Sequence, residues 1–339
     1  MEKNFTAEEL LLTKELPSYD FLFSLVNNVS EVLEAENVEY RPKDKSGNPG
    51  SLIELKDDIP VIVVPDLHAR PYFLLNLLKY KLPENILNQK NLTVEKALEK
   101  KMLYIVCVGD AIHTEHTAER WRQIEDEFNN KCYTGQNMTE EMIECLSTLT
   151  GIMKLKCDYP ENFHFIKGNH ENILNETANG DYAFCKYAEE GQMVKKFISE
   201  YYGDDILFLI SFYEQSLPLI ISSKNCVISH AEPSKSFTRE QLINAKSDAE
   251  TVFGLIWTRN GQVKENTVEF VLNELLGKKH ASKAFYFAGH RPVKGKYSLR
   301  QNGKFIQIHN PLEQNVAIVS KDKIFNPDED IYEVRNERD

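Results

Sequence analysis

The 339-residue sequence lacks any long hydrophobic run. Polar residues interrupt every apolar stretch well before the roughly 20 residues that a membrane-spanning helix needs. The N-terminal segment, MEKNFTAEELLLTKEL, also lacks the basic region followed by an apolar core that marks a signal peptide. We therefore expect a cytoplasmic protein without a membrane partner.

An excess of positive charge is also missing. Lys and Arg number 40 against 52 Asp and Glu, which gives a formal net charge of −12. Nucleic acids attract proteins through positive charge, so we expect no nucleic-acid partner. A local basic pocket for a small anion is still compatible with this balance.

Paired cysteines, repeats and low-complexity tracts are absent as well. The six cysteines form no C-x-x-C pair, and most lie within apolar segments, as reduced and buried thiols do. We expect them to fill the core. With 42% hydrophobic and 27% charged residues, the composition is that of a globular protein and excludes disordered and fibrous classes.

The chain divides into a helical beginning, a main fold and an acidic end. Thr6 and Glu9 have the spacing of a capping box, and apolar residues over 21–33 recur with a helical period, which predicts two helices. The polar, turn-rich segment 41–50 follows them. The predicted parts are a helical extension over 1–50, the main domain over 51–325 and a solvated acidic tail over 326–339.

From about residue 51, short β-rich runs alternate with helical ones, which predicts an α/β fold. Ligands of open α/β sheets collect beyond the carboxyl ends of the strands. Five predicted strands end just before polar residues, so we expect their ends to converge on one site. These strands cover 59–64, 103–108, 163–167, 226–229 and 284–288.

Amphipathic patterns predict helices between these strands and a hairpin near the end of the chain. The segment 116–160 carries two of the helices and forms either a cap over the site or a peripheral helical layer. After residue 290, the runs 297–299, 304–308 and 315–320 predict antiparallel strands, with Gln301–Asn302–Gly303 as a hairpin turn.

Five short segments after the predicted strands hold carboxylates, an amide and imidazoles. Such a set suits borderline divalent ions such as Mn, Fe, Zn or Co, and the absence of thiols argues against a structural zinc cage. Two neighbouring ions can polarise a phosphoryl oxygen and activate a water, so the set predicts hydrolysis of a phosphate ester. The segments are Pro65-Asp66-Leu67-His68, Gly109-Asp110, Gly168-Asn169-His170-Glu171, Ser229-His230-Ala231 and Gly289-His290-Arg291-Pro292.

In this order, the motifs D-x-H, G-D, G-N-H-E, H and G-H resemble the calcineurin-like metallophosphoesterase superfamily over roughly residues 59–320. The single histidine of the last motif and the segment Leu255-Ile256-Trp257 resemble its phosphoprotein phosphatase branch. That branch includes bacterial Ser/Thr phosphatases and symmetrical diadenosine tetraphosphate hydrolases. The resemblance implies a fold of two packed mixed β-sheets flanked by helices, classed as α/β or, in some schemes, α+β. It also implies a metal-dependent phosphatase.

The resemblance assigns a role to each motif residue. It implies two divalent ions, with Mn as the first choice and Fe, Zn or Co as alternatives. His170 and Asp110 would be catalytic, with His170 acting on the leaving oxygen and Glu171 orienting it or its loop. The implied reaction is direct attack of metal-bound hydroxide on a phosphomonoester. Asp66, His68 and Asp110 would hold one ion, and Asp110, Asn169, His230 and His290 the other.

The second motif departs from the G-D-x-V-D-R-G of the branch. His113 stands where an aspartate would pair with the catalytic histidine, and Thr114 where an arginine would hold phosphate. Glu115 or Glu171 is then a candidate to orient His170, and His113 and His116 are either extra ligands or structural. The candidates for contacting the substrate are Arg259, which we also count as catalytic, together with Asn169, Arg291, Arg70 and His309.

Three functions stay open at this point. The first is a phosphatase acting on phosphoserine or phosphothreonine in proteins. The second is a hydrolase of nucleotides or dinucleoside polyphosphates. The third, from another class, is a metal- and phosphate-binding scaffold protein with weak catalysis, which the missing D-R-G triplet motivates.

Overall fold

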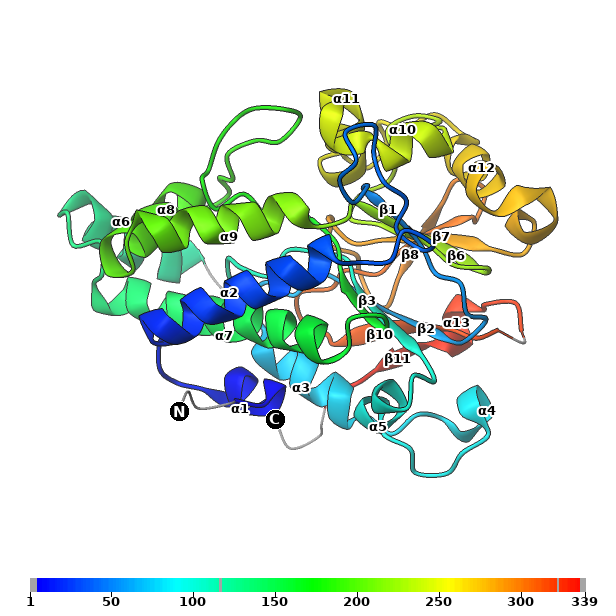
Figure 1. Ribbon diagram of the computed structural model, residues 1–339, viewed down its shortest axis with the longest axis horizontal. Helices are drawn as coiled ribbons and strands as arrows, with labels where there is room; N and C mark the ends of the chain where they lie inside the picture. The colour runs from blue at the N-terminus through cyan, green and yellow to red at the C-terminus, as the bar shows by residue number, and fades with distance from the viewer. Residues whose placement is uncertain (1–4, 116–117, 322, 336–339) are drawn as a thin grey trace.

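Two β-sheets lie at the centre of the computed structural model, which describes residues 5–115, 118–321 and 323–335 (Figure 1). The six-stranded sheet has the order β1 (Leu52–Glu54), β5 (Ile220–Ser222), β6 (Cys226–Ser229), β7 (Phe285–Ala288), β9 (Phe305–Gln307) and β8 (Ser298–Arg300). The five-stranded sheet has the order β11 (Ile331–Glu333), β10 (Asn315–Val319), β2 (Val61–Val64), β3 (Tyr104–Cys107) and β4 (Phe163–Phe165). Both sheets mix parallel and antiparallel pairs.

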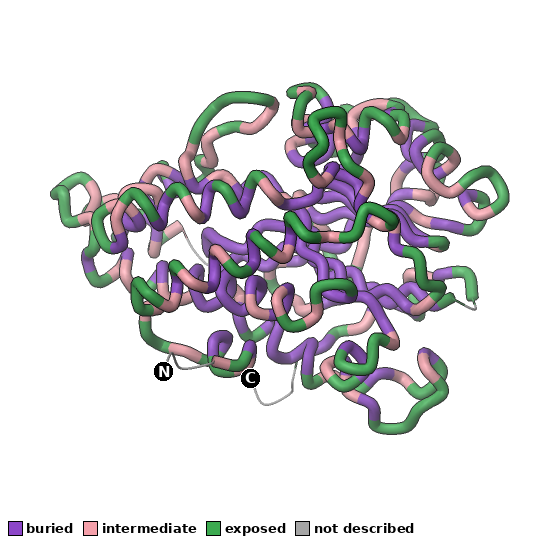
Figure 2. Tube along the Cα trace, viewed as in Figure 1, coloured by how far each residue is buried: buried purple, intermediate pink, exposed green. Residues whose placement is uncertain are grey.

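The two sheets pack against each other through alternate side chains. In β2, Val61 and Val63 belong to the core between the sheets, whereas Ile62 and Val64 face the helices. Because successive side chains of a strand point to opposite faces, a strand buried on both faces is apolar throughout. Figure 2 shows the buried residues concentrated along these strands.

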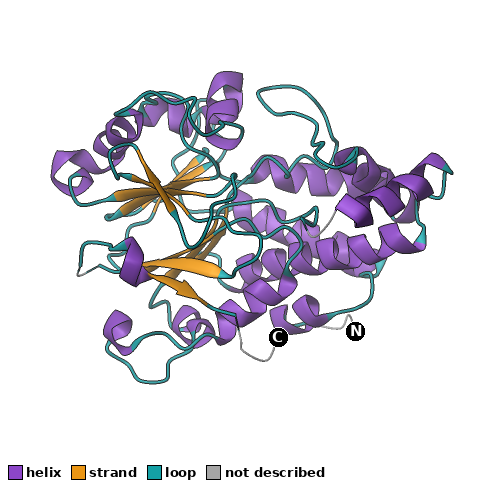
Figure 3. Cartoon of the chain, turned by 180° about the vertical axis from the view of Figure 1, so that it is seen from behind, coloured by secondary structure: helices purple, strands orange, loops and turns teal. Residues whose placement is uncertain are grey.

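Helices cover the outer face of each sheet. Those packed with the six-stranded sheet are α10 (Arg239–Ile243), α11 (Ala249–Ile256) and α12 (Thr267–Ala281). Those packed with the five-stranded sheet are α1 (Ala7–Leu12), α2 (Tyr19–Glu34), α3 (Pro71–Lys79), α5 (Val94–Glu99), α6 (Ala118–Asn129), α7 (Gln136–Asp158), α8 (Glu190–Tyr201) and α9 (Asp204–Ser216). The short helices α4 (Glu84–Leu87), η1 (Ala245–Ser247) and α13 (Pro327–Asp330) lie between these elements. Figure 3 shows the larger helical group gathered beside the strands.

The structure confirms the predicted fold of two mixed sheets with flanking helices. All five predicted strands form, as β2, β3, β4, β6 and β7, and the hairpin turns at residues 301–304 between β8 and β9. Strands β1 and β5, with three residues each, were not predicted. In the described residues, no helix is both apolar enough and long enough to cross a bilayer.

The helices that precede the main domain in sequence are part of its core. Leu22, Val26 and Val29 of α2 are fully buried in the cluster that also contains Ile62 of β2. Within the segment 116–160, residues 118–129 form α6 and residues 136–158 form α7, and α7 packs against α1, α2 and β4. Helix α7 thus packs in the helical layer beside the five-stranded sheet.

Two expectations need correction. The acidic end is not a solvated tail throughout, because α13 and β11 form there and β11 pairs with β10. The six cysteines are free, and Cys107, Cys145 and Cys226 are buried as expected. Cys132 and Cys185 are exposed instead of filling the core.

Candidate metal centre

The polar motifs all lie in turns that follow the carboxyl ends of strands. Asp66 and His68 follow β2, Asp110 follows β3 and Asn169 follows β4, three strands that run parallel in the five-stranded sheet. His230 and His290 follow β6 and β7, which run parallel in the six-stranded sheet. The site therefore forms where the strand ends of both sheets meet.

The turns bring these side chains together because glycines allow close approach. A Cβ on Gly168 would lie 2.2 Å from Oδ1 of Asp110, and a Cβ on Gly289 would lie 1.7 Å from Oδ1 of Asp66. Asp110 and His290 adopt left-handed backbone angles, with φ of 56° and 64°. Such conformations are costly for residues with side chains and gather at functional sites.

One half of the site is built around the amide oxygen of Asn169. This oxygen lies 2.8 Å from Nε2 of His230 and 2.8 Å from Nδ1 of His290. Oδ2 of Asp110 lies 3.5 Å from the same His230 nitrogen. The four residues expected to hold the second ion thus converge.

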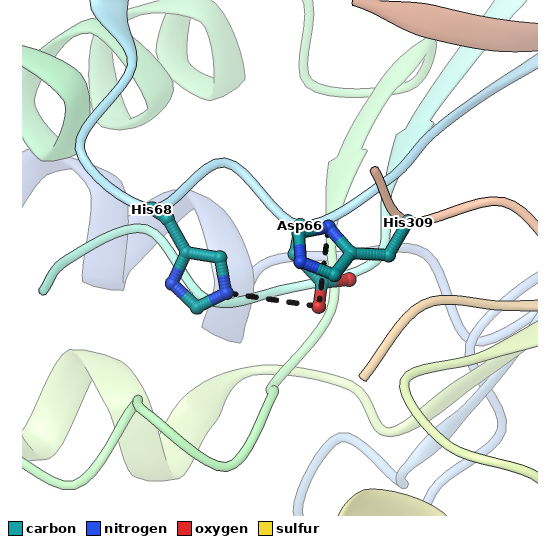
Figure 4. Close-up of side chains that lie close together, drawn as sticks. All are labelled: Asp66, His68 and His309. Atoms are coloured by element: carbon teal, nitrogen blue, oxygen red, sulfur yellow. Dashed lines mark ion pairs between the residues drawn. The ribbon is translucent and has the colours of Figure 1, made fainter. Parts of the chain in front are cut away.

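The other half is built around the carboxylate of Asp66 (Figure 4). Nε2 of His68 lies 3.8 Å from Oδ2 of Asp66 and 3.7 Å from Oδ2 of Asp110. Nδ1 of His309 lies 3.7 Å from the same Asp66 oxygen, and Figure 4 shows both imidazoles beside this carboxylate. His309, expected to contact substrate, therefore lies with the residues of the first ion.

Three overlapping groups of ligand atoms result, each with its atoms within 4.8 Å of one another. Two positions side by side, sharing Asp110, are what a pair of ions requires. The groups are Asp66 with His68 and His309, His68 with Asp110 and His170, and Asp66 with Asp110 and His230.

Hydrogen bonds on the far side of the imidazoles set which nitrogen faces the centre. Nδ1 of His68 lies 3.1 Å from the carbonyl oxygen of His113, and Nδ1 of His230 lies 2.8 Å from that of Val108. These nitrogens donate to the carbonyls, which leaves Nε2 of each ring with a free lone pair. In His309 the order is reversed, because Nε2 lies 3.0 Å from Glu115 and the buried Nδ1 has no hydrogen-bond partner.

The electrostatics of the site fit a divalent cation. Burial lowers the pKa of His68 to about 4 and lowers those of His230 and His290 from their usual range, so these rings are neutral and can bind a metal. Burial and the nearby charge of Asp66 raise the pKa of Asp110. A cation between the two carboxylates would offset this repulsion.

Glu171 positions a loop, one of the two roles expected for it. Its carboxylate accepts the backbone N–H groups of Asp110 (2.9 Å), Ala111 (2.8 Å) and Gly168 (2.7 Å). It therefore joins the turns after β3 and β4. Glu115, the other candidate for orienting His170, contacts His309 and pairs with Lys186.

The altered second motif forms a buried pair of histidines. Nδ1 of His113 lies 3.0 Å from Nδ1 of His170, at the place predicted for an aspartate–histidine pair. Thr114 donates its hydroxyl to the buried Glu141 (2.7 Å). Burial lowers the pKa of His113 to about 3 and lowers that of His170 strongly, so the pair is neutral. His116, the other candidate in this segment, lies outside the described residues.

Arg70 holds two turns of the backbone together, and its expected contact with the substrate stays a prediction. Its guanidinium donates to five carbonyl oxygens within 2.7–3.2 Å, two in the turn after β2 and three in the segment 310–313. It therefore holds the turn that carries Asp66 and His68 against the turn that carries His309.

Arg259 and Arg291 remain available for an anion. Within the described residues, neither guanidinium has an ion pair with an acid, and Nε of Arg291 is buried without a hydrogen-bond partner. Burial and the charge of nearby Arg259 lower the pKa of Arg291. Two guanidinium groups close together, beside the turn of His290, are suited to a phosphate group.

Comparisons with known proteins agree with this geometry. The family described as calcineurin-like phosphoesterase matches residues 59–311. No curated protein matches the sequence.

The comparison with solved structures finds similar chains at low sequence identity. A protein serine/threonine phosphatase from Saccharomyces cerevisiae has a TM-score of 0.58 and 16% identity, and the match covers 94% of this chain and 89% of that one. A cold-active protein tyrosine phosphatase of a psychrophilic Shewanella species has a TM-score of 0.45 and 14% identity, over 84% of this chain and 82% of that one. The first match supports the fold and nothing finer.

Proposed function

Because the chain belongs to the calcineurin-like phosphoesterase family and is thus a phosphoric ester hydrolase, we propose that it removes phosphate from phosphomonoesters at a site for two divalent metal ions. The observation that carries the proposal is the set of three overlapping ligand groups at the meeting point of the two sheets. All their members are buried, and burial lowers the pKa values of His68 and His230, which keeps these imidazoles in the neutral form that metal binding needs.

Each side chain has a separate task in this proposal. Asp66, His68, Asp110 and His309 would hold one ion, and Asp110 with Asn169, His230 and His290 would hold the other. Bound there, the ions would supply Lewis-acid polarisation of the phosphoryl group and a water of lowered pKa. Mn is the first choice for both ions.

His170 and the two free arginines complete the site. Nε2 of His170 lies 3.6 Å from Oδ2 of Asp110, so its ring borders the ion positions and can act on the leaving oxygen. Arg259 and Arg291 grip the non-bridging oxygens and neutralise the charge that develops in the transition state. Neither arginine has an acid to compete with phosphate within the described part of the chain.

The substrate beyond the phosphate group stays a matter of prediction. The motif resemblance gives phosphoserine and phosphothreonine in proteins, and the yeast structure with the same fold is a serine/threonine phosphatase. Nucleotides and dinucleoside polyphosphates are the alternative. The surroundings of the leaving oxygen at His170 bear on this choice.

The test is hydrolysis of p-nitrophenyl phosphate with Mn added. We expect activity in the unaltered protein and a loss of at least about 100-fold in Asp110→Asn and His170→Asn. Elemental analysis of the same samples should find two ions per chain in the unaltered protein. Equal rates in all three proteins would rule out the proposal.

A further inference from the structure

A long loop, residues 172–189, joins the Gly168–Glu171 motif to α8 and extends to α11. Figure 1 shows it as the green arch between these helices. Near its tip, Gly180 has a φ of 83°, and a Cβ there would lie 1.9 Å from the carbonyl oxygen of Ala249 in α11. Asp181 accepts a hydrogen bond of 2.8 Å from Nε1 of Trp257, and the ring of Tyr182 meets the Trp257 ring edge-on. The loop is therefore attached at its tip as well as at its ends.

From this loop, Phe184 reaches the histidine pair. Its ring centroid lies 3.6 Å from that of His170 and 5.0 Å from that of His113. The backbone N–H of Phe184 donates to Oδ1 of Asn175 (3.1 Å), which holds the backbone of the loop at this position. Lys186 of the same loop pairs with Glu115, whose carboxylate also contacts His309.

This arrangement gives the leaving group an aromatic neighbour. His170 borders the ion positions on one side, through Asp110, and the Phe184 ring on another. A phosphate bound at the ion positions with its leaving oxygen at His170 would place the attached group beside the His170 ring, and the ring of Phe184 lies next to that ring. A flat ring can stack on Phe184 there, whereas a short aliphatic chain leaves most of the Phe184 surface uncovered.

We propose that the loop 172–189 forms the leaving-group subsite and that Phe184 makes the enzyme select phosphomonoesters of aromatic alcohols, the phenol class, over those of aliphatic alcohols. This inference rests on the proposed phosphomonoesterase function. It places phosphorylated phenols, such as a tyrosine side chain carries, before phosphoserine and phosphothreonine. Phe184 is a specificity residue, and the chemistry stays with His170 and the residues that would hold the ions.

The experiment separates binding from chemistry. Benzylphosphonate has a methylene in place of the bridging oxygen of phenyl phosphate, and propylphosphonate is its aliphatic counterpart. Calorimetry gives the Kd of each for the Mn-loaded, full-length protein and for Phe184→Ala, Phe184→Leu and Phe184→Tyr. Phe212→Ala, which removes an exposed ring from α9, is the matched control.

We expect the unaltered protein to bind benzylphosphonate more tightly than propylphosphonate. In Phe184→Ala and Phe184→Leu this preference should fall about three- to tenfold, the value of one aromatic contact. Phe184→Tyr and Phe212→Ala should keep the preference for benzylphosphonate. The kcat/KM for phenyl phosphate should also fall in Phe184→Ala and Phe184→Leu and be kept in Phe184→Tyr and Phe212→Ala. Circular dichroism, thermal melting and Mn content of each variant show whether the fold and the metal centre are retained.

Two results would overturn the inference while leaving the proposed function intact. One is hydrolysis of phenyl phosphate with an unchanged preference in Phe184→Ala. The other is an equal gain in affinity for both phosphonates in that variant, which would show that the Phe184 ring blocks the site and does not select the leaving group. If the Mn-loaded protein neither hydrolyses phenyl phosphate nor binds either phosphonate, the proposed function fails and the inference fails with it.

Discussion

At the scale of single residues, each of three buried imidazoles donates a hydrogen bond from one ring nitrogen, which leaves the lone pair of the other nitrogen free to bind a metal. In His68 and His230, the Nδ1–H group donates a hydrogen bond to a backbone carbonyl. In His309, the Nε2–H group donates a hydrogen bond to Glu115. In each case the remaining nitrogen faces a carboxylate of the centre. His309, which no motif contains, therefore presents its Nδ1 to Asp66 in the same way that His68 presents its Nε2, which is the basis for proposing it as a ligand.

His309→Gln should therefore weaken binding of the first ion. An imidazole ligand whose other nitrogen donates to a carboxylate contributes strongly to metal affinity. We therefore expect the affinity for one of the two ions to fall at least about 10-fold. Calorimetric titration of the metal-free protein with Mn measures this directly. His280→Gln, at the end of α12, is the control and should leave both affinities unchanged. Two unaltered binding steps in His309→Gln would show that His309 is no ligand.

Arg291 offers a second prediction at this scale. Its buried Nε lacks a partner, so a phosphate oxygen there would make a charge-assisted hydrogen bond. We expect Arg291→Ala to lower kcat/KM for p-nitrophenyl phosphate about 10- to 100-fold, as the loss of such a bond does. Arg122→Ala removes an exposed guanidinium from α6 and should have no effect. An equal loss of activity in Arg122→Ala would show that the effect of Arg291→Ala comes from the net charge of the protein and not from a contact with phosphate.

At the scale of elements, a buried ion network ties the end of α2 to α7. Glu36 pairs with Lys156 at 2.6 Å and with Arg41, and all three side chains are buried. Burial alone would raise the pKa of Glu36, but the charges of Lys156 and Arg41 outweigh it and lower the pKa from its usual 4.5 to about 2. The helical extension is thereby fixed to the layer that covers the five-stranded sheet.

Glu36→Gln should destabilise the protein by about 3–5 kcal/mol, because two buried cations lose their partner. Since its pKa is lowered in the folded state, the stabilisation by Glu36 is present above about pH 4.5 and is lost as the pH falls toward 2. Urea unfolding between pH 7 and pH 3 should show the difference between the two proteins shrinking toward acid pH. Glu8→Gln, which breaks an exposed pair with Lys79, should cost no more than about 1 kcal/mol. Equal costs for the two variants would contradict this account.

The elements also mark where sequence patterns stop being informative. Strands that end in motifs, such as β2 before Asp66, are apolar and bounded by turns, so the sequence predicts them. Helix α9 was missed, because its apolar residues form no narrow stripe and its exposed face carries Phe208 and Phe212. No local pattern records that β6 and β7 belong to a different sheet from β2 and β3.

At the scale of the whole molecule, the ions would connect the two sheets. Asp66, Asp110 and Asn169 come from the five-stranded sheet, and His230 and His290 from the six-stranded sheet. A cation bound to residues of both sheets stabilises the folded state over the unfolded chain, where these ligands are far apart. The site is therefore coupled to the stability of the fold.

Removal of metal should lower the melting temperature, and adding Mn should restore it. Each ion at a concentration 100-fold above its Kd contributes about 2.7 kcal/mol. Differential scanning calorimetry with chelator, and then with Mn in excess, measures the change. Asp110→Asn removes the shared carboxylate, so its melting temperature should respond little to Mn. The same response in Asp110→Asn and the unaltered protein would place the stabilising ions elsewhere.

The sequence by itself determined the two-sheet fold and the motif residues that converge, because each motif follows a strand and carries the donors that divalent ions prefer. Only the tertiary structure showed what Arg70, His309 and Phe184 contact. Arg70 is held by carbonyls, His309 joins Asp66 from β9, and Phe184 reaches His170 from a distant part of the chain. The physical reason is that such contacts depend on which turns meet in space, and a residue outside a local pattern leaves no trace of its neighbours in the sequence.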